Sequence, residues 1–141
     1  MSEEPNDRLL DVLSERADTM CRDLDADAVA ISRVIGDVLI LIVERVPEGM
    51  TLQQGAGYLI PDYPQTAQVL DSGAPLTLTL ADPGVDEDEA RVLRDLGFGA
   101  LAMLPLYLNS STWGLIEIYR TAARSFTNAD VQRAVELSRV S

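Results

Sequence analysis

The chain has 141 residues, the length of one domain with a single hydrophobic core, and its formal net charge is −12. Nucleic acids and anionic membrane surfaces are bound by clustered cations, so this charge argues strongly against both as partners. The chain contains no histidine and no lysine, and Cys21 is its only cysteine, which removes imidazole bases, lysine Schiff bases, internal disulfides and multi-cysteine zinc sites.

No segment is apolar over the roughly 20 residues that a membrane-spanning helix needs. The longest apolar runs are residues 38–43 and 100–108. The first residues, Met-Ser-Glu-Glu, lack the apolar region of a secretory signal. We therefore expect a cytoplasmic protein.

The first expected element is an amphipathic helix over residues 7–25, because apolar residues recur there at spacings of three and four. Cys21 lies on this apolar stripe, which predicts a buried structural thiol. Two β-branched runs, residues 28–35 and 38–46, are separated only by Gly36-Asp37, a strong hairpin signal. The second run is apolar at successive positions, so both of its faces should be covered.

The middle of the chain gives weaker signals. A third strand is expected within residues 50–59 and a short helix over 62–70, followed by a short strand. A better defined helix begins at Asp86, which can cap the first turn while Glu89 reaches back to the capped backbone, and it ends at Gly97. The acidic cluster at its start lacks the ligand spacing of a calcium loop.

The last third of the chain predicts a second hairpin, residues 100–108 and 112–120, followed by a helix over 127–141. Thr127 is expected to cap this helix and to form a capping box with Asp130. The helix reaches the chain end without a stop signal, which is typical of a domain cut from a longer polypeptide.

Glu117 is a carboxylate between Ile116 and Ile118 on the last expected strand. We expect it to point to the opposite face from these neighbours and to pair with an arginine, either Arg120 or Arg33. The alternative is that Glu117 contacts a ligand.

Together these elements predict one α+β domain over residues 1–141, with a core over 28–121 between an N-terminal and a C-terminal helix. A mainly antiparallel sheet with helices on both faces accounts for their order. The chain contains no internal repeat and no low-complexity linker.

Five short strings, in this order and spacing, resemble those of a GAF domain of actinobacterial type. They are Asp62-Tyr-Pro-Gln-Thr with Val69-Leu-Asp-Ser-Gly-Ala-Pro75, then Leu93-Arg-Asp-Leu-Gly97, Leu104-Pro-Leu106, Gly114-Leu-Ile-Glu-Ile-Tyr119 and Phe126-Thr127 with Asp130. The resemblance covers about residues 8–141. It implies a central antiparallel sheet of five or six strands, with the N- and C-terminal helices on one face and a small pocket, wrapped by residues 50–98, on the other. It also implies a homodimer through the terminal helices, which would pass a signal to a downstream output domain.

Several activities known for GAF domains depend on, or are marked by, residues that this chain lacks or carries elsewhere. Haem needs an axial ligand, normally histidine, and bilins are attached through a pocket cysteine, whereas Cys21 lies in the N-terminal helix. The free methionine sulfoxide reductases of the family use several pocket cysteines. The cyclic-nucleotide-binding members carry an Asn-Lys…Phe-Asp-Glu signature, which a chain without lysine cannot contain. We therefore expect no haem, no bilin and no metal.

The residues expected to line the pocket are polar or adaptable side chains: Tyr58, Tyr63, Thr66, Arg91, Arg94 and Met103. Arg91 and Arg94 would favour an anionic ligand if they pointed inward. The alternative is that both balance the acidic residues 86–89 on the outside of their helix. For Tyr58 and Tyr63 the alternative is packing at the rim and in the core.

These observations predict a non-enzymatic module of a cytoplasmic signal-transduction protein that senses an unknown small molecule and forms a homodimer. The alternative is a pocketless dimerisation or protein-interaction domain whose helices only pair subunits. A redox or other enzyme, with a site built on carboxylates, is a remote alternative.

Overall fold

A mixed sheet of seven strands forms the centre of the computed structural model, which describes residues 5–52 and 55–140. The strand order is β3-β2-β1-β6-β5-β4, and β7 pairs with β5. The strands are β1 Ala28–Ile35, β2 Val38–Arg45, β3 Gly57–Leu59, β4 Leu76–Thr79, β5 Ala100–Leu108, β6 Ser111–Arg120 and β7 Arg139–Val140. Every pairing is antiparallel except that of β5 with β7.

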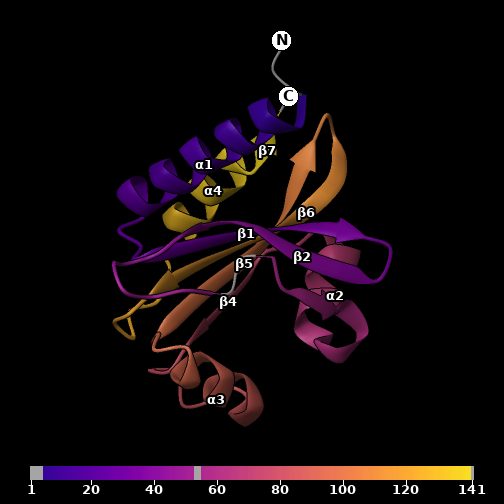
Figure 1. Cartoon of the computed structure of the whole chain (residues 1–141). Helices are drawn as coiled ribbons and strands as arrows, with labels where there is room; N and C mark the ends of the chain where they lie inside the picture. The colour runs from indigo at the N-terminus through magenta and orange to yellow at the C-terminus, as the bar shows by residue number, and fades with distance from the viewer. Residues whose placement is uncertain (1–4, 53–54, 141) are drawn as a thin grey trace.

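The helices cover both faces of this sheet (Figure 1). Helix α1, Pro5–Asp23, and helix α4, Asn128–Leu137, lie on one face. The short helices α2, Pro64–Ser72, and α3, Glu87–Asp95, lie on the other, where the 3₁₀ turn η1, Ile60–Asp62, precedes α2. This arrangement confirms the expected α+β fold of GAF type, with the terminal helices together on one face.

The sheet separates two apolar cores. The helix-face core packs α1 and α4 against the sheet and includes Met20, Ile116 and Ile118. The cavity-face core lies under α2 and α3 and includes Leu93, Leu115 and Tyr119. Because side chains alternate along a strand, β6 contributes to both cores from successive positions.

The C-terminal helix is shorter than the expected 127–141, and that expectation is wrong. Helix α4 ends at Leu137, and residues 139–140 form β7. Strand β4 covers the edge of β5 only along residues 100–103, so the backbone donors beyond it need other acceptors. The carbonyl oxygens of Ser138 and Val140 accept from the backbone N–H groups of Tyr107 and Asn109, both at 2.9 Å. This pairing also raises the strand number above the five or six expected.

The local signals along the chain are confirmed in most cases. Helix α1 covers residues 5–23 instead of 7–25, and the Gly36-Asp37 turn joins β1 to β2 as expected. Thr127 and Asp130 form the expected capping box. Residues 53–54, within the region of the expected third strand, lie outside the described residues, and β3 itself is short. No helix in the described part of the chain is long and apolar enough to cross a membrane.

Arg120 at the end of β6 is buried and joins the two terminal helices. Its guanidinium donates to the backbone carbonyl oxygens of residues 24, 25, 124 and 125 and lies 3.2 Å from Asp130 Oδ2. Its Cζ lies 4.0 Å from the centre of the Phe126 ring. A planar guanidinium can hold this many acceptors at once. Arg120 therefore fastens the end of α1 and the start of α4 to the sheet.

Candidate functional site

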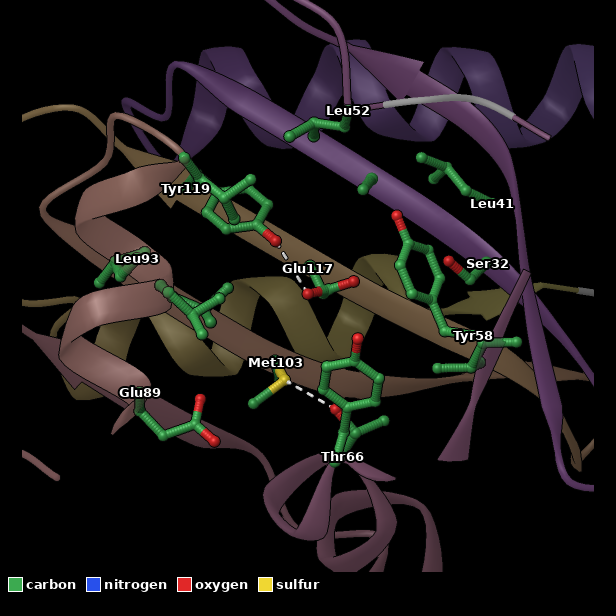
Figure 2. A pocket seen from close by; sticks show the side chains of 16 residues that line it. Ser32, Leu41, Leu52, Tyr58, Thr66, Glu89, Leu93, Met103, Glu117 and Tyr119 are labelled. Carbon is green, nitrogen blue, oxygen red and sulfur yellow. Dashed lines mark hydrogen bonds between the residues drawn. The ribbon is translucent and has the colours of Figure 1, made fainter. Parts of the chain in front are cut away.

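A cavity of about 200 Å³ lies between the sheet and the short helices α2 and α3 (Figure 2). Most of its wall is aliphatic, with side chains from β2, α3 and β5. Tyr63, Val92 and Leu96 are exposed as well as lining, so they mark the side on which the cavity opens. The lining residues are Ala30, Ser32, Leu39, Leu41, Leu52, Tyr58, Tyr63, Thr66, Glu89, Val92, Leu93, Leu96, Leu101, Met103, Glu117 and Tyr119.

Glu117 lies deep in the cavity and is held by its neighbour on the same face of β6. The Tyr119 hydroxyl donates to Glu117 Oε2 at 2.8 Å. The Tyr119 ring is itself fixed by stacking on Phe98, with 4.6 Å between the ring centres. Burial raises the pKa of Glu117, the hydrogen bond from Tyr119 opposes this rise, and the charge of Glu89 adds to it. Burial and the Glu117 carboxylate also raise the pKa of Tyr119, so Tyr119 stays a donor.

The expectation that Glu117 pairs with Arg120 or Arg33 is wrong. Glu117 does face away from Ile116 and Ile118, but this face carries the cavity. Arg120 is held at the junction of the terminal helices, and Arg33 Cζ lies 5.3 Å from the centre of the Trp113 ring. Arg120 and Arg33 are therefore both engaged in contacts that do not involve Glu117.

Glu89 brings a second carboxylate to the cavity from the first turn of α3 (Figure 2). Asp86 caps this helix as expected, since its side chain accepts from the Glu89 N–H at 3.1 Å. The Glu89 side chain lines the cavity, which is not the reach back to the capped backbone that the sequence suggests. Partial burial raises the pKa of Glu89, and the charges of Asp86 and Asp88 add to the effect.

Hydroxyl groups supply the remaining polar surface. Ser32 comes from β1, Tyr58 from β3, and Tyr63 and Thr66 from the start of α2. The Tyr58 and Tyr63 rings meet edge to face, with 6.0 Å between their centres. The Thr66 hydroxyl lies 3.8 Å from Met103 Sδ. A thioether is a weak acceptor, so Thr66 can exchange this contact for a better one.

Four of the six residues expected from the sequence line the cavity, and two do not. Tyr58, Tyr63, Thr66 and Met103 lie together around it. Arg91 lies on the outer face of α3, where its Nη2 is 2.6 Å from Asp88 Oδ1 in an exposed ion pair. Arg94, one turn later, is exposed as well. The apolar stripe of α3 faces the sheet and turns both arginines outward.

The sequence interpretation did not name Ser32, Glu89 or Tyr119 as lining residues, and it gave a ligand contact by Glu117 only as the alternative. Glu117 gave a usable signal, because a carboxylate between two isoleucines is unusual on an apolar strand. Ser32 and Tyr119 gave none, since both residue types are common in ordinary strands and cores. Glu89 had a different expected role, in capping α3, so its place in the cavity lining was not predicted.

Cys21 lies on the other face of the sheet from the cavity. Cys21 packs against the helix-face core, and burial raises the pKa of its thiol. Among the described residues, no group of three or more cysteine, aspartate and glutamate side chains lies close enough to hold a metal ion.

The chain matches the family model of the GAF domain over residues 8–140. A comparison with curated protein sequences found no significant match. Among solved structures, the blue-light-absorbing form of the PixJ GAF domain of Thermosynechococcus elongatus is similar, with 18% identity, a TM-score of 0.75 and coverage of 92% of this chain and 80% of that one. The phycoerythrobilin-bound GAF domain of a cyanobacterial phytochrome gives 18% identity, a TM-score of 0.75 and coverage of 92% and 83%. The GAF domain of a two-component sensor histidine kinase from Bacillus halodurans gives 17% identity, a TM-score of 0.67 and coverage of 89% of this chain and 88% of that one.

These comparisons correct the expectation that the chain takes no cofactor. That expectation included the absence of a bilin, argued from the position of Cys21, yet a solved domain of the same fold holds phycoerythrobilin. A thiol in the pocket determines only whether a chromophore is attached covalently, so the position of Cys21 cannot exclude one.

The expectation that this GAF domain is of actinobacterial type stays a prediction, because these solved structures come from cyanobacteria and a Bacillus. The match over residues 8–140 and the agreement of fold place the chain in a family of regulatory and sensory modules. The chain belongs to the GAF domain family.

Proposed function

We propose that this GAF domain is a non-enzymatic module of a cytoplasmic signal-transduction protein, and that it senses a small molecule bound in the cavity between the sheet and α2–α3. One observation carries the proposal: a cavity with aliphatic walls into which a few polar groups converge from β1, β3, β6, α2 and α3. Ligand sites in proteins have this character. The same cavity counts against a pocketless domain.

The chemistry of the lining supports binding more than turnover. The chain has no histidine or lysine, and Cys21 packs on the opposite side of the sheet. The hydroxyl groups of Ser32, Tyr58 and Thr66 therefore have no such base to activate them as nucleophiles. The Tyr119 hydroxyl donates a hydrogen bond to Glu117, and this hydroxyl stays protonated.

Strand β6 offers a route from the cavity to the terminal helices. Glu117 and Tyr119 face the cavity, whereas Ile116 and Ile118 pack under α1 and α4. The next residue, Arg120, holds the junction of the two helices. A ligand that moves Glu117 or Tyr119 would therefore act on a segment bonded to both terminal helices, and through them on a neighbouring domain.

The proposal includes a homodimer through the terminal helices. Leu10 and Val12 are exposed apolar residues on α1, and covering them would remove apolar surface from water. We expect Leu10→Glu combined with Val12→Glu to shift sedimentation equilibrium toward the monomer. Ile35→Glu, at an exposed position in the β1–β2 hairpin, is the control. A wild-type chain that sediments as a monomer would contradict this part of the proposal.

A thermal-shift screen against metabolites tests the sensing function. Phycoerythrobilin belongs in the panel, because a solved GAF domain of the same fold binds it. A ligand at a hundred times its Kd stabilises the native state by about 2.7 kcal/mol. For a domain of this size we expect Tm to rise by roughly 5–10 °C.

The variant Thr66→Phe, which fills the cavity from α2, should abolish this rise. Thr77→Phe is the matched control, since Thr77 is an exposed residue of β4 outside the cavity. If no compound in the panel stabilises the wild-type protein, the sensing function is contradicted. A stabilising compound whose effect survives Thr66→Phe would place binding elsewhere.

A further inference from the structure

The cavity contains a buried carboxylate, Glu117, that forms no ion pair with any arginine in the described part of the chain. Glu117 Oε2 accepts from Tyr119, and the other carboxylate oxygen faces the open space of the cavity (Figure 2). An ionised carboxylate has room for several further hydrogen bonds. Part of the Glu117 surface is accessible, and this part lies against the cavity.

The charges around Glu117 are all of one sign. The sixteen lining residues include Glu117 and Glu89 and no arginine, and the chain has neither lysine nor histidine. The other titratable groups that face the cavity are the phenols Tyr58 from β3, Tyr63 from the start of α2 and Tyr119 from β6. A buried carboxylate is costly without a positive partner, so a ligand that brings one is favoured. An anionic ligand would meet two carboxylates in a region of low dielectric constant.

We propose that the cavity selects a compact ligand that carries a protonated nitrogen group, such as an amine, amidine or guanidine, on an apolar body, and that Glu117 binds this group. This inference rests on the proposed sensing function and names the class of its ligand. It differs from the anionic ligand that Arg91 and Arg94 would favour if they pointed inward, since both lie outside the cavity.

The rest of the lining fits both ends of such a ligand. Leu93, Leu101 and Met103 provide an aliphatic wall for the apolar body. The edge-to-face pair of Tyr58 and Tyr63 presents aromatic surface, which attracts organic cations. A volume of about 200 Å³ lies below the range typical of drug-sized ligands, roughly 300–1,000 Å³, which favours a compact molecule.

A purely structural role for Glu117 is the competing explanation, in which the carboxylate only accepts from Tyr119. The variant Glu117→Gln separates the two roles. The amide oxygen of glutamine can still accept from the Tyr119 hydroxyl, and the shape of the side chain is kept. Only the negative charge is removed.

The test uses three probes of the same size and ring with different charge: benzamidine, benzamide and benzoate. Affinity is measured by isothermal titration with the full chain, and the site is identified from the ¹³C-methyl signals of methionine. We expect benzamidine to bind most tightly and benzoate most weakly. Benzamidine should shift the Met103 methyl signal and leave that of Met20, in the helix-face core, unchanged.

In Glu117→Gln, benzamidine affinity should fall by roughly 10- to 100-fold, the range of a charge-assisted hydrogen bond, while benzamide affinity stays within about twofold. Glu89→Gln, nearer the solvent, should produce a smaller loss. Should Glu117→Gln fail to fold, the charge ranking of the wild type and the Met103 shift still decide the question.

Three outcomes would overturn the inference: benzoate binding as tightly as benzamidine, unchanged benzamidine affinity in Glu117→Gln, or no binding of any probe. None of these three results decides whether the domain senses a small molecule, which the metabolite screen tests separately. A stabilising neutral or anionic metabolite that loses its effect in Thr66→Phe would keep the sensing function and reject this ligand class.

Discussion

Arg120 and Glu117 lie three residues apart on β6, and the two buried charges have very different surroundings. Arg120 donates to four backbone carbonyl oxygens and pairs with Asp130, so its bonding capacity is nearly used within the fold. Glu117 has a hydrogen bond from Tyr119 and faces a cavity with one of its oxygens. The first arrangement is that of a structural joint. The second leaves capacity for a partner that the chain does not supply.

Strand β6 contributes both to a packed structural face of the sheet and to the face that carries the cavity. On the face of β6 toward α1 and α4, Ile116 and Ile118 are buried in the helix-face core, and Gly114 approaches β1 so closely that an added Cβ would overlap the carbonyl oxygen of Ser32. The residues facing α2 and α3 are spaced around a void. A rigid face therefore supports a face that can accept a ligand.

The largest effect is expected from Arg120→Met. The substitution leaves several buried carbonyl oxygens and the Asp130 carboxylate without their donor, so the free energy of unfolding should fall by about 3–5 kcal/mol. Urea unfolding followed by circular dichroism measures this loss. Arg33→Met, which removes an exposed arginine that stacks on Trp113, is the control and should lose about 1 kcal/mol or less. Equal losses would remove the distinction between Arg120 and an ordinary surface arginine.

A smaller loss is expected from Asp130→Asn, which weakens the partner of Arg120. Although partial burial acts in the opposite direction, hydrogen bonds from Thr127 and Arg120 lower the pKa of Asp130 below its ordinary value of 3.8. Stabilisation by Asp130 is therefore full above pH 3.8 and is lost as the pH falls through the folded-state pKa. At neutral pH we expect a loss of about 1–2 kcal/mol in urea unfolding, which shrinks in acid.

Asp88→Asn provides the matched control for this change. Asp88 forms an exposed ion pair with Arg91, and such pairs contribute little to stability. An Asp130→Asn variant as stable as Asp88→Asn at neutral pH would contradict the structural role given to the Arg120 joint.

The smallest effect on stability, and one of opposite sign, is expected from Glu117→Gln. Burial raises the pKa of Glu117 above its ordinary value of 4.5, so folding favours the protonated form. Its contribution to stability is full below pH 4.5 and is lost as the pH rises through the folded-state pKa. The glutamine variant stays neutral, so at neutral pH it should exceed the wild type by about 1 kcal/mol, with the difference vanishing in acid.

Thermal unfolding of both proteins across this pH range measures the difference. A Glu117→Gln variant that is less stable than the wild type at neutral pH would mean that the carboxylate is satisfied within the fold, as Arg120 is. The contrast between the two residues would then disappear.

Local signals in the sequence predicted most of the fold. The apolar stripe of α1, the Gly36-Asp37 turn and the Thr127–Asp130 capping box each depend on residues close together in the chain, and each is found. The end of α4 was not predictable in this way. It depends on backbone donors of β5, about thirty residues earlier, which take the carbonyl oxygens of Ser138 and Val140.

The candidate site was harder to predict for a related reason. Alternation along β6 correctly groups Glu117 with Tyr119, but it does not say which face of the sheet is hollow. The direction of Arg91 and Arg94 depends on the rotation of a short helix relative to the sheet, which the apolar stripe of α3 sets. The residue types left open whether these two arginines face the pocket, whereas the lining carries two carboxylates and no arginine.

The aromatic residues of the chain are divided between the two faces of the sheet. Trp113, the only tryptophan, packs against the helix-face core under Arg33, whereas Tyr58, Tyr63 and Tyr119 line the cavity. The protein therefore carries two optical reporters on opposite sides of β6. Tyrosine absorption near the cavity reports occupancy, and tryptophan emission reports the helix face. A ligand that changes both would reveal, without any label, that the sheet transmits binding to the terminal helices.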